Sequence, residues 1–153
     1  MKLAFGSDHA GAALKTDLLR HAASLGHEVE DLGGIEGQPS DYPLVSATVG
    51  EGVVSGRYDR GVLVCGSGLG VSIAANKVPG VRAALCHETY SARMSREHND
   101  ANVLCLGQRV VGSGLAREVL GVFLQTAFSG GENHRRRIGQ IASYERHARS
   151  ERR

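Results

Sequence analysis

The chain has 153 residues, 41% of them hydrophobic and 22% charged, which is ordinary globular usage and enough for one domain, over 1–153, with a buried core. The formal net charge is +2, yet residues 134–153 alone hold seven Arg and two Glu. Apart from Tyr144, aromatic side chains are not interleaved with this basic run, so we expect a solvated helix and no nucleic-acid partner. No apolar run approaches the ~18 residues of a membrane span, so we expect no membrane partner.

The cysteines give a second exclusion. Cys65, Cys86 and Cys105 are odd in number and form no C-x-x-C pair, so neither a disulfide framework nor a zinc site is expected. Free thiols fit a reducing compartment, and the first residues turn polar too soon for a signal peptide. We therefore expect a cytoplasmic protein. No His and carboxylate pair has metal-ligand spacing, and no metal is predicted.

Short apolar runs alternate with segments of helical periodicity along the chain. The apolar runs predict strands at Lys2–Phe5, Glu28–Leu32, Gly61–Cys65, Val81–Cys86 and Asn102–Leu106. The periodic segments predict helices at 10–25, Leu44–Val54, Val71–Lys77, Glu88–His98, around 115–123 and at 135–149. This alternation indicates an α/β fold: a Rossmann-like three-layer sandwich with a five-stranded parallel sheet and helices on both faces.

Ligands of such sheets bind outside the carboxyl ends of the strands. The residues that follow the strands are therefore the candidates: Ser7–His9, Cys65–Gly70, Cys86–His87 and Leu106–Arg109. Simpler roles remain open for some of them. Asp8 could cap the following helix, Asp41–Pro43 could be a turn, and His98 could serve only the dipole of the helix that it ends.

The segment Cys65-Gly66-Ser67-Gly68-Leu69-Gly70 joins the most apolar strand to a helix. Its glycines let backbone N–H groups turn inward beside a helix N-terminus, as a cradle for a phosphate or a developing oxyanion. It is not a P-loop, because no Lys follows at the required spacing. Val71 stands where a dinucleotide fingerprint needs a small residue and where a cysteine phosphatase loop needs Arg.

A thiol beside such a cradle can remove a proton alpha to a carbonyl, while N–H groups hold the enediolate oxygen. Helix N-termini favour the thiolate that this chemistry needs. The alternative is that Cys65 is a small core residue, as free Cys often is. For Cys86 and Cys105 the core interpretation is preferred, because neither precedes a glycine cradle.

Taken together, the motifs resemble those of B-type ribose-5-phosphate isomerases, in the family that also holds the galactose-6-phosphate isomerase subunits. The matches are GSDHAG at 6–11, DYP at 41–43, VCGSGLGVSIAANKVPGVRAAL at 64–85, YSARMSREHNDANVL at 90–104 and GQRVVG at 107–112. The resemblance implies an aldose–ketose isomerase that converts D-ribose 5-phosphate to D-ribulose 5-phosphate through a cis-enediolate, without a cofactor.

The resemblance also implies residue roles. Cys65 is implied as the base, His98 as the acid that opens the furanose ring, and Ser67 as part of the enediolate cradle. The implied substrate-binding residues are Asp8, His9, Tyr42, Gly66, Gly68, Gly70, Asn99, Arg109 and Arg137. Of these, His9, Arg109 and Arg137 are implied as phosphate ligands.

The resemblance implies an assembly as well. Members are homodimers, or pairs of dimers, whose active site takes His98, Asn99 and Arg109 from the neighbouring subunit. The basic helix at 135–149 is then expected to pack on the dimer partner. One branch of the family uses a Glu at the position of Val71 in place of the Cys; this sequence has the Cys form.

One segment departs from the family. The usual G-G-R-H-x-x-R is replaced by Gly130-Gly131-Glu132-Asn133-His134-Arg135-Arg136-Arg137, with one residue inserted and Asn133 where Arg is usual. Arg135 or Arg136 could replace the missing phosphate ligand. The change keeps open the same chemistry on erythrulose 4-phosphate or on allose or galactose 6-phosphate. A non-catalytic sugar-phosphate or nucleotide-binding module is a further alternative, against which Cys65, Ser67 and His98 together argue.

Overall fold

The computed structural model describes residues 1–34 and 38–150, and its centre is a single parallel sheet with the strand order β2-β1-β3-β5-β4. The strands are β1 (Lys2–Ser7), β2 (Glu28–Asp31), β3 (Arg60–Cys65), β4 (Ala83–Leu85) and β5 (Val103–Gly107). The helices are α1 (Ala12–Ser24), α2 (Tyr42–Val54), α3 (Leu69–Ala75), α4 (Thr89–Glu97), α5 (Ser113–Gln125) and α6 (Glu132–Ser150). The predicted α/β fold with a five-stranded parallel sheet is confirmed.

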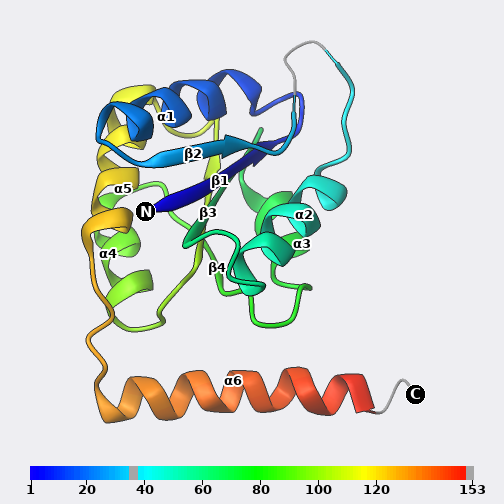
Figure 1. The fold of residues 1–153 in the computed structure, drawn as a ribbon, viewed down its shortest axis with the longest axis vertical. Helices are drawn as coiled ribbons and strands as arrows, with labels where there is room; N and C mark the ends of the chain where they lie inside the picture. Colours follow the sequence, from blue (N-terminus) through cyan, green and yellow to red (C-terminus); the bar gives the residue numbers. More distant parts are fainter. Residues whose placement is uncertain (35–37, 151–153) are drawn as a thin grey trace.

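Helices cover both faces of the sheet, with α1, α4 and α5 on one face and α2 and α3 on the other (Figure 1). The strand β3 shows why its sequence is apolar at every position. Val62 and Val64 pack in the core under α1 and α5, while Leu63 and Cys65 pack in the core under α2 and α3. Each such side chain contributes roughly 1.5–3 kcal/mol when fully buried. The alternation also places Cys65 on the α2–α3 side.

Most predicted boundaries differ from the observed ones by one to three residues; α3, for example, begins at Leu69 and α6 at Glu132. Two of the differences have a clear physical reason. Strand β4 begins at Ala83, two residues late, because the Arg82 N–H donates to the side-chain oxygen of Asn102 at 2.8 Å instead of to a strand. Helix α2 begins at Tyr42, with Pro43 in its first turn. A proline is tolerated there because the first N–H groups of a helix have no intrahelical partner.

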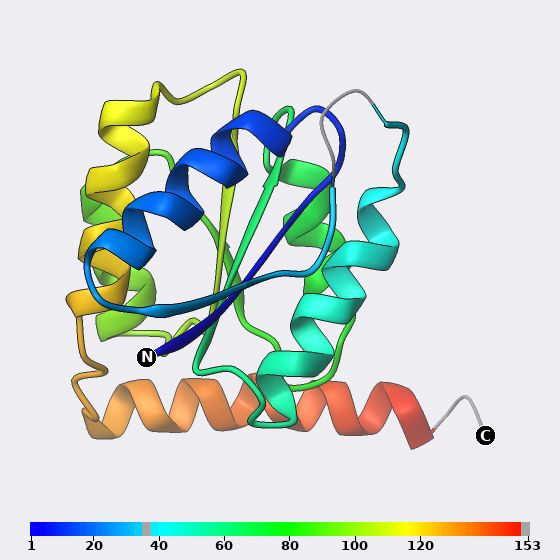
Figure 2. The same cartoon turned by 45° about the horizontal axis from the view of Figure 1, so that its top comes forward.

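The last helix, α6, lies apart from the sandwich and crosses one end of it (Figures 1 and 2). Within the described residues, two contacts join α6 to the rest of the molecule. The Gly80 N–H donates to the Glu145 carboxylate at 3.1 Å, and the rings of His98 and His134 stack with their centroids 4.3 Å apart. Tyr144 and Ile141 are 79% and 47% exposed, so α6 leaves apolar side chains uncovered. In the described part of the chain, no helix combines the length and apolarity needed to cross a membrane.

Candidate active site

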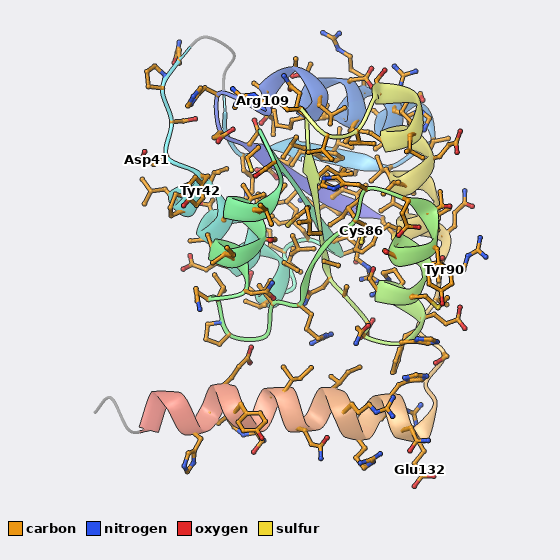
Figure 3. The ribbon with its side chains drawn as sticks, turned by 180° about the vertical axis from the view of Figure 1, so that it is seen from behind. Asp41, Tyr42, Cys86, Tyr90, Arg109 and Glu132 are labelled. Carbon is orange, nitrogen blue, oxygen red and sulfur yellow. The ribbon has the colours of Figure 1, made fainter. Side chains whose placement is uncertain are left out.

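A cavity of about 420 Å³ opens at the carboxyl ends of β1 and β3, where the topology predicts a ligand site. It is lined by Asp8, His9, Ala10, Tyr42, Cys65, Gly66, Ser67, Gly70, Arg109 and Val110. Tyr42 and Arg109 lie at the same end of the molecule (Figure 3). The structure therefore gathers most of the predicted site residues, from four separate segments, around one cavity.

Cys65 ends β3, and its side chain reaches this cavity while remaining only 4% exposed. The Gly68 N–H donates to the Cys65 Sγ at 3.0 Å. Gly68 has φ 79°, and a Cβ there would lie 2.4 Å from Leu85 and 2.9 Å from the Leu106 carbonyl carbon. Glycine is thus required at the position that aims this N–H at the thiol.

The other two cysteines have a different environment. Burial raises the pKa of Cys86 to about 11 and raises the pKa of Cys105 well above its ordinary value. Both thiols stay protonated at neutral pH, and neither lines the Cys65 cavity. This agrees with the core interpretation of Cys86 and Cys105.

Asp8 is buried at the cavity, and its Oδ1 accepts hydrogen bonds from the N–H groups of Ala10 at 2.9 Å and Gly11 at 3.0 Å. The alternative that Asp8 caps α1 is wrong, because Gly11 is the N-cap residue and α1 begins at Ala12. The two N–H groups of the preceding turn capture the carboxylate instead. A Cβ on Gly11 would lie 2.4 Å from the Val64 carbonyl oxygen, so this turn rests directly on β3.

Arg109 belongs to the cavity of its own chain. Its N–H donates to the Gly66 carbonyl oxygen at 3.0 Å, and its guanidinium lies 3.5 Å from the place of a Cβ on Gly66. The expectation that Arg109 comes from a neighbouring subunit is therefore wrong. The reason is the strand order: β5 lies next to β3, so the turn after Gly107 passes over the Gly66–Gly70 loop.

The remaining predicted residues lie outside this cavity. His98 follows α4, which starts at the carboxyl edge of the sheet and runs back to the opposite edge. The His98 ring stacks on His134 with an interplanar angle of 9°. Arg137 is exposed on α6. Figure 3 shows Glu132, the first residue of α6, at the opposite end of the molecule from Tyr42 and Arg109. Within one chain, His98, Asn99 and Arg137 are thus not brought to Cys65.

The comparison with known proteins identifies the family. The sequence profile described as Ribose/Galactose Isomerase matches residues 3–141. The chain belongs to that family. It is 44% identical to ribose-5-phosphate isomerase B of Escherichia coli over 94% of this chain and 96% of that protein. It is 39% identical to D-erythrulose-4-phosphate isomerase of Pectobacterium atrosepticum over 96% and 99% of the two chains.

The solved structures agree. Ribose-5-phosphate isomerase B of Clostridium thermocellum superposes with a TM-score of 0.95 at 49% identity, covering 97% of this chain and 99% of that chain. The protein is thus a sugar phosphate isomerase of the ribose/galactose isomerase family, and the interpretation as a non-catalytic module is dropped. The cavity at Cys65 is its candidate active site.

One residue next to the site, outside the cavity lining, has no role predicted from the sequence. His87 follows β4, and its Nε2 accepts the Gly107 N–H at 2.9 Å, in the place of the carbonyl that a longer strand would offer. Burial lowers the pKa of His87, which keeps the ring a neutral acceptor. Gly107 in turn rests on the loop, because a Cβ there would lie 2.5 Å from the Ser67 carbonyl carbon. The only signal for His87 in the sequence is its place after a strand.

The departing segment of this family member lies at the start of α6. The Asn133 side-chain oxygen accepts from Arg136 at 3.3 Å, and the Arg135 guanidinium lies 2.9 Å from the place of a Cβ on Gly130. Within the described residues, no three His, Cys, Asp or Glu side chains are grouped to hold a metal ion.

Proposed function

We propose that this isomerase interconverts D-ribose 5-phosphate and D-ribulose 5-phosphate through a cis-enediolate, with Cys65 as the base. The observation that carries the proposal is the Cys65 sulfur, which lines the cavity and accepts an N–H from Gly68 at 3.0 Å. The thiolate takes the C2 proton of the open-chain aldose, and a proton is returned to C1 as the carbonyl moves to C2. Relatives named for this activity, at 44% and 49% identity, support the choice of sugar.

The enediolate would be held by the loop that follows Cys65. Ser67 is exposed at the cavity, and its Oγ accepts the Leu69 N–H at 3.3 Å, which orients the hydroxyl. Gly66 and Gly70 let the backbone approach a ligand closely. Preorganised donors at a developing oxyanion are each worth about 2.7–4 kcal/mol of transition-state stabilisation.

The two ends of the substrate would meet different residues of the same cavity. Asp8 is an anchored carboxylate that can accept from a sugar hydroxyl, and Tyr42 packs its ring within 3.0 Å of the place of a Cβ on Gly70. His9 and Arg109 are exposed at the cavity and suit the phosphate. A guanidinium binds phosphate oxygens in a bidentate manner, which fixes the substrate in one direction.

The site would be completed by a second copy of the chain. The edge opposite Cys65 carries His98, Asn99 and Arg137. In an isologous dimer, every contact between one subunit and its partner occurs twice, with the subunits exchanged. Such a dimer can therefore place these residues of each subunit at the Cys65 cavity of the other. The exposed Ile141 and Tyr144 of α6 give this helix an apolar face for a partner. We therefore propose a homodimer in which His98 of one subunit opens the furanose ring at the Cys65 of the other.

A tetrose phosphate is the second candidate substrate. The 39% identity to an erythrulose-4-phosphate isomerase and the Asn133 departure favour it. Both candidates keep the Cys65 chemistry and differ only at the far end of the sugar.

A coupled assay of the purified protein on ribose 5-phosphate, erythrose and erythrulose 4-phosphate, and allose and galactose 6-phosphate tests the proposal. We expect the highest kcat/KM for ribose 5-phosphate. A higher kcat/KM for a tetrose or hexose phosphate would reject the pentose and retain the chemistry. The same reaction is run on ribose 5-phosphate that carries deuterium at C2. Complete transfer of that deuterium to C1, with no exchange with solvent, would indicate a hydride shift and reject the enediolate route.

A further inference from the structure

The turn after α4 has an unusual backbone. Asp100 has φ 46°, and it is the one non-glycine residue with a positive φ in the described part of the chain. Glycine adopts this left-handed conformation most easily, although Asp and Asn tolerate it. A side chain at such a position therefore needs a reason.

The Asp100 carboxylate is shared by two arginines. Its Oδ1 accepts from Arg96 Nη1 at 2.8 Å and its Oδ2 from Arg82 Nη2 at 3.2 Å. The Arg96 side chain is only 3% exposed, and its Nε also donates to the Thr126 carbonyl oxygen at 3.3 Å. The carboxylate is thus attached to a cation that the core holds in place, and glycine at this position would lose that attachment.

Arg82 also donates hydrogen bonds to the backbone of the turn. Arg82 Nε donates to the carbonyl oxygen of Asn99 at 2.9 Å, and its Nη2 donates to that of Asp100 at 2.9 Å. The neighbourhood is crowded with positive charge: burial lowers the pKa of Arg60, the Arg96 charge lowers it further, and Asp100 acts in the opposite direction. Asp100 therefore offsets repulsion among these arginines while it fixes the turn.

His98 and Asn99 stand directly before this fixed residue. The His98 side chain is 42% exposed and faces away from the core, stacked on His134. A general acid must lie within about 2.6–3.2 Å of the atom that it protonates. The position of the His98 ring therefore depends on a turn whose carboxylate and carbonyls are all bound by Arg82 and Arg96.

We propose that Asp100, clamped between Arg82 and Arg96, is a positioning residue for ring opening and not for proton transfer at C1 and C2. The inference rests on the proposed function, in which His98 gives a proton to the ring oxygen. As the C1–O4 bond breaks, the C1 hydroxyl loses its proton to water and the aldehyde forms. The later proton transfer uses Cys65 and its loop, which lie at the other edge of the chain and share no contact with the clamp.

Ribulose 5-phosphate separates the two steps, because its O5 carries the phosphate and it cannot close a furanose ring. The experiment measures kcat for ribose 5-phosphate and, in D2O, the rate of deuterium uptake at C1 of ribulose 5-phosphate. The variants are Asp100→Gly, which accepts the backbone without strain but removes the carboxylate, and Asp100→Asn, which keeps one acceptor. Thermal unfolding is recorded for each. Because displacement of Asn99 would raise KM for both sugars, the comparison is made at saturation.

For Asp100→Gly we expect kcat on ribose 5-phosphate to fall roughly 10- to 100-fold, with deuterium uptake within about twofold of wild type. The kcat of Asp100→Asn on ribose 5-phosphate should lie between those of wild type and Asp100→Gly. An equal fall of both rates, or no fall of either, would overturn the inference. If wild-type protein fails to interconvert the two pentose phosphates, the proposed function itself is rejected, which is a separate result from any difference among the variants.

Discussion

At the residue scale, the three cysteine thiols of the chain differ in their surroundings. Cys65 borders the cavity and accepts an N–H, whereas Cys86 and Cys105 are buried with raised pKa values. Replacing Cys65 by Ala should lower kcat about 1,000-fold, because the proposed base is lost. The matched variant Cys86→Ala removes an equal side chain and should keep kcat within about twofold of wild type. Assays of both variants, with circular dichroism to confirm folding, check this; substantial turnover by Cys65→Ala would remove it as the base.

Cys86 also makes a prediction for stability. Burial raises its pKa to about 11 in the folded protein, above the ordinary thiol value of about 8.5. The folded state therefore holds the Cys86 proton more tightly than the unfolded state does. The resulting contribution to the free energy of unfolding is fully present below about pH 8.5 and is lost as the pH rises through about 11. Over that whole range the loss should be about 3 kcal/mol, because each pKa unit corresponds to about 1.4 kcal/mol. Melting curves under reducing conditions, at about pH 7.5 and about pH 10.5, should show a smaller decrease for Cys86→Ala than for wild type. Equal decreases would contradict the assignment.

At the element scale, the segment Gly66–Gly68, which is proposed to hold the enediolate, depends on its contact with the end of β5. A Cβ on Gly107 would lie 2.5 Å from the Ser67 carbonyl carbon and 2.6 Å from its oxygen. Gly107→Ala should therefore destabilise the fold by about 1–3 kcal/mol and lower kcat by displacing Ser67. Gly121, in α5, is the control because a Cβ there meets open space. Gly121→Ala should stabilise the protein by about 0.5–1 kcal/mol with kcat unchanged. Parallel kinetics and melting curves decide; unchanged kcat in Gly107→Ala would show that the loop does not need this contact.

The sequence predicts elements best where the local pattern and the packing agree. The run GVLVC is apolar throughout because β3 is covered on both faces. The glycines after it predict the loop, although α3 already begins at Leu69 and includes Gly70. The start of β4 is missed because a side chain, that of Asn102, takes the N–H that a strand would use. Local pattern also says nothing of which chain supplies a residue. The family resemblance implies that Arg109 comes from a neighbouring subunit, and only the adjacency of β5 and β3 shows that it reaches Gly66 of its own chain.

At the scale of the whole molecule, one chain does not bring together the two sets of residues to which the proposed reaction assigns a role. Cys65, Ser67 and Arg109 lie at the carboxyl edge of the sheet, and His98 and Arg137 lie towards the edge crossed by α6. Helix α4 explains the separation, because any helix that follows a parallel strand returns to the opposite edge. A sheet of this topology cannot unite its two edges, so the proposed reaction with both Cys65 and His98 requires a second chain.

That requirement can be tested by mixing inactive subunits. Cys65→Ala and His98→Ala chains should each be inactive on ribose 5-phosphate as homodimers. In a mixed dimer, the intact Cys65 of one chain meets the intact His98 of the other, which restores one of the dimer's sites and leaves the other doubly altered. With random pairing of equal amounts, activity should return to about a quarter of wild type. The chains are refolded together, and separately refolded chains combined just before the assay are the control. If each chain formed its active site alone, refolding the two variants together would restore no activity on ribose 5-phosphate. That result would reject a site shared between subunits.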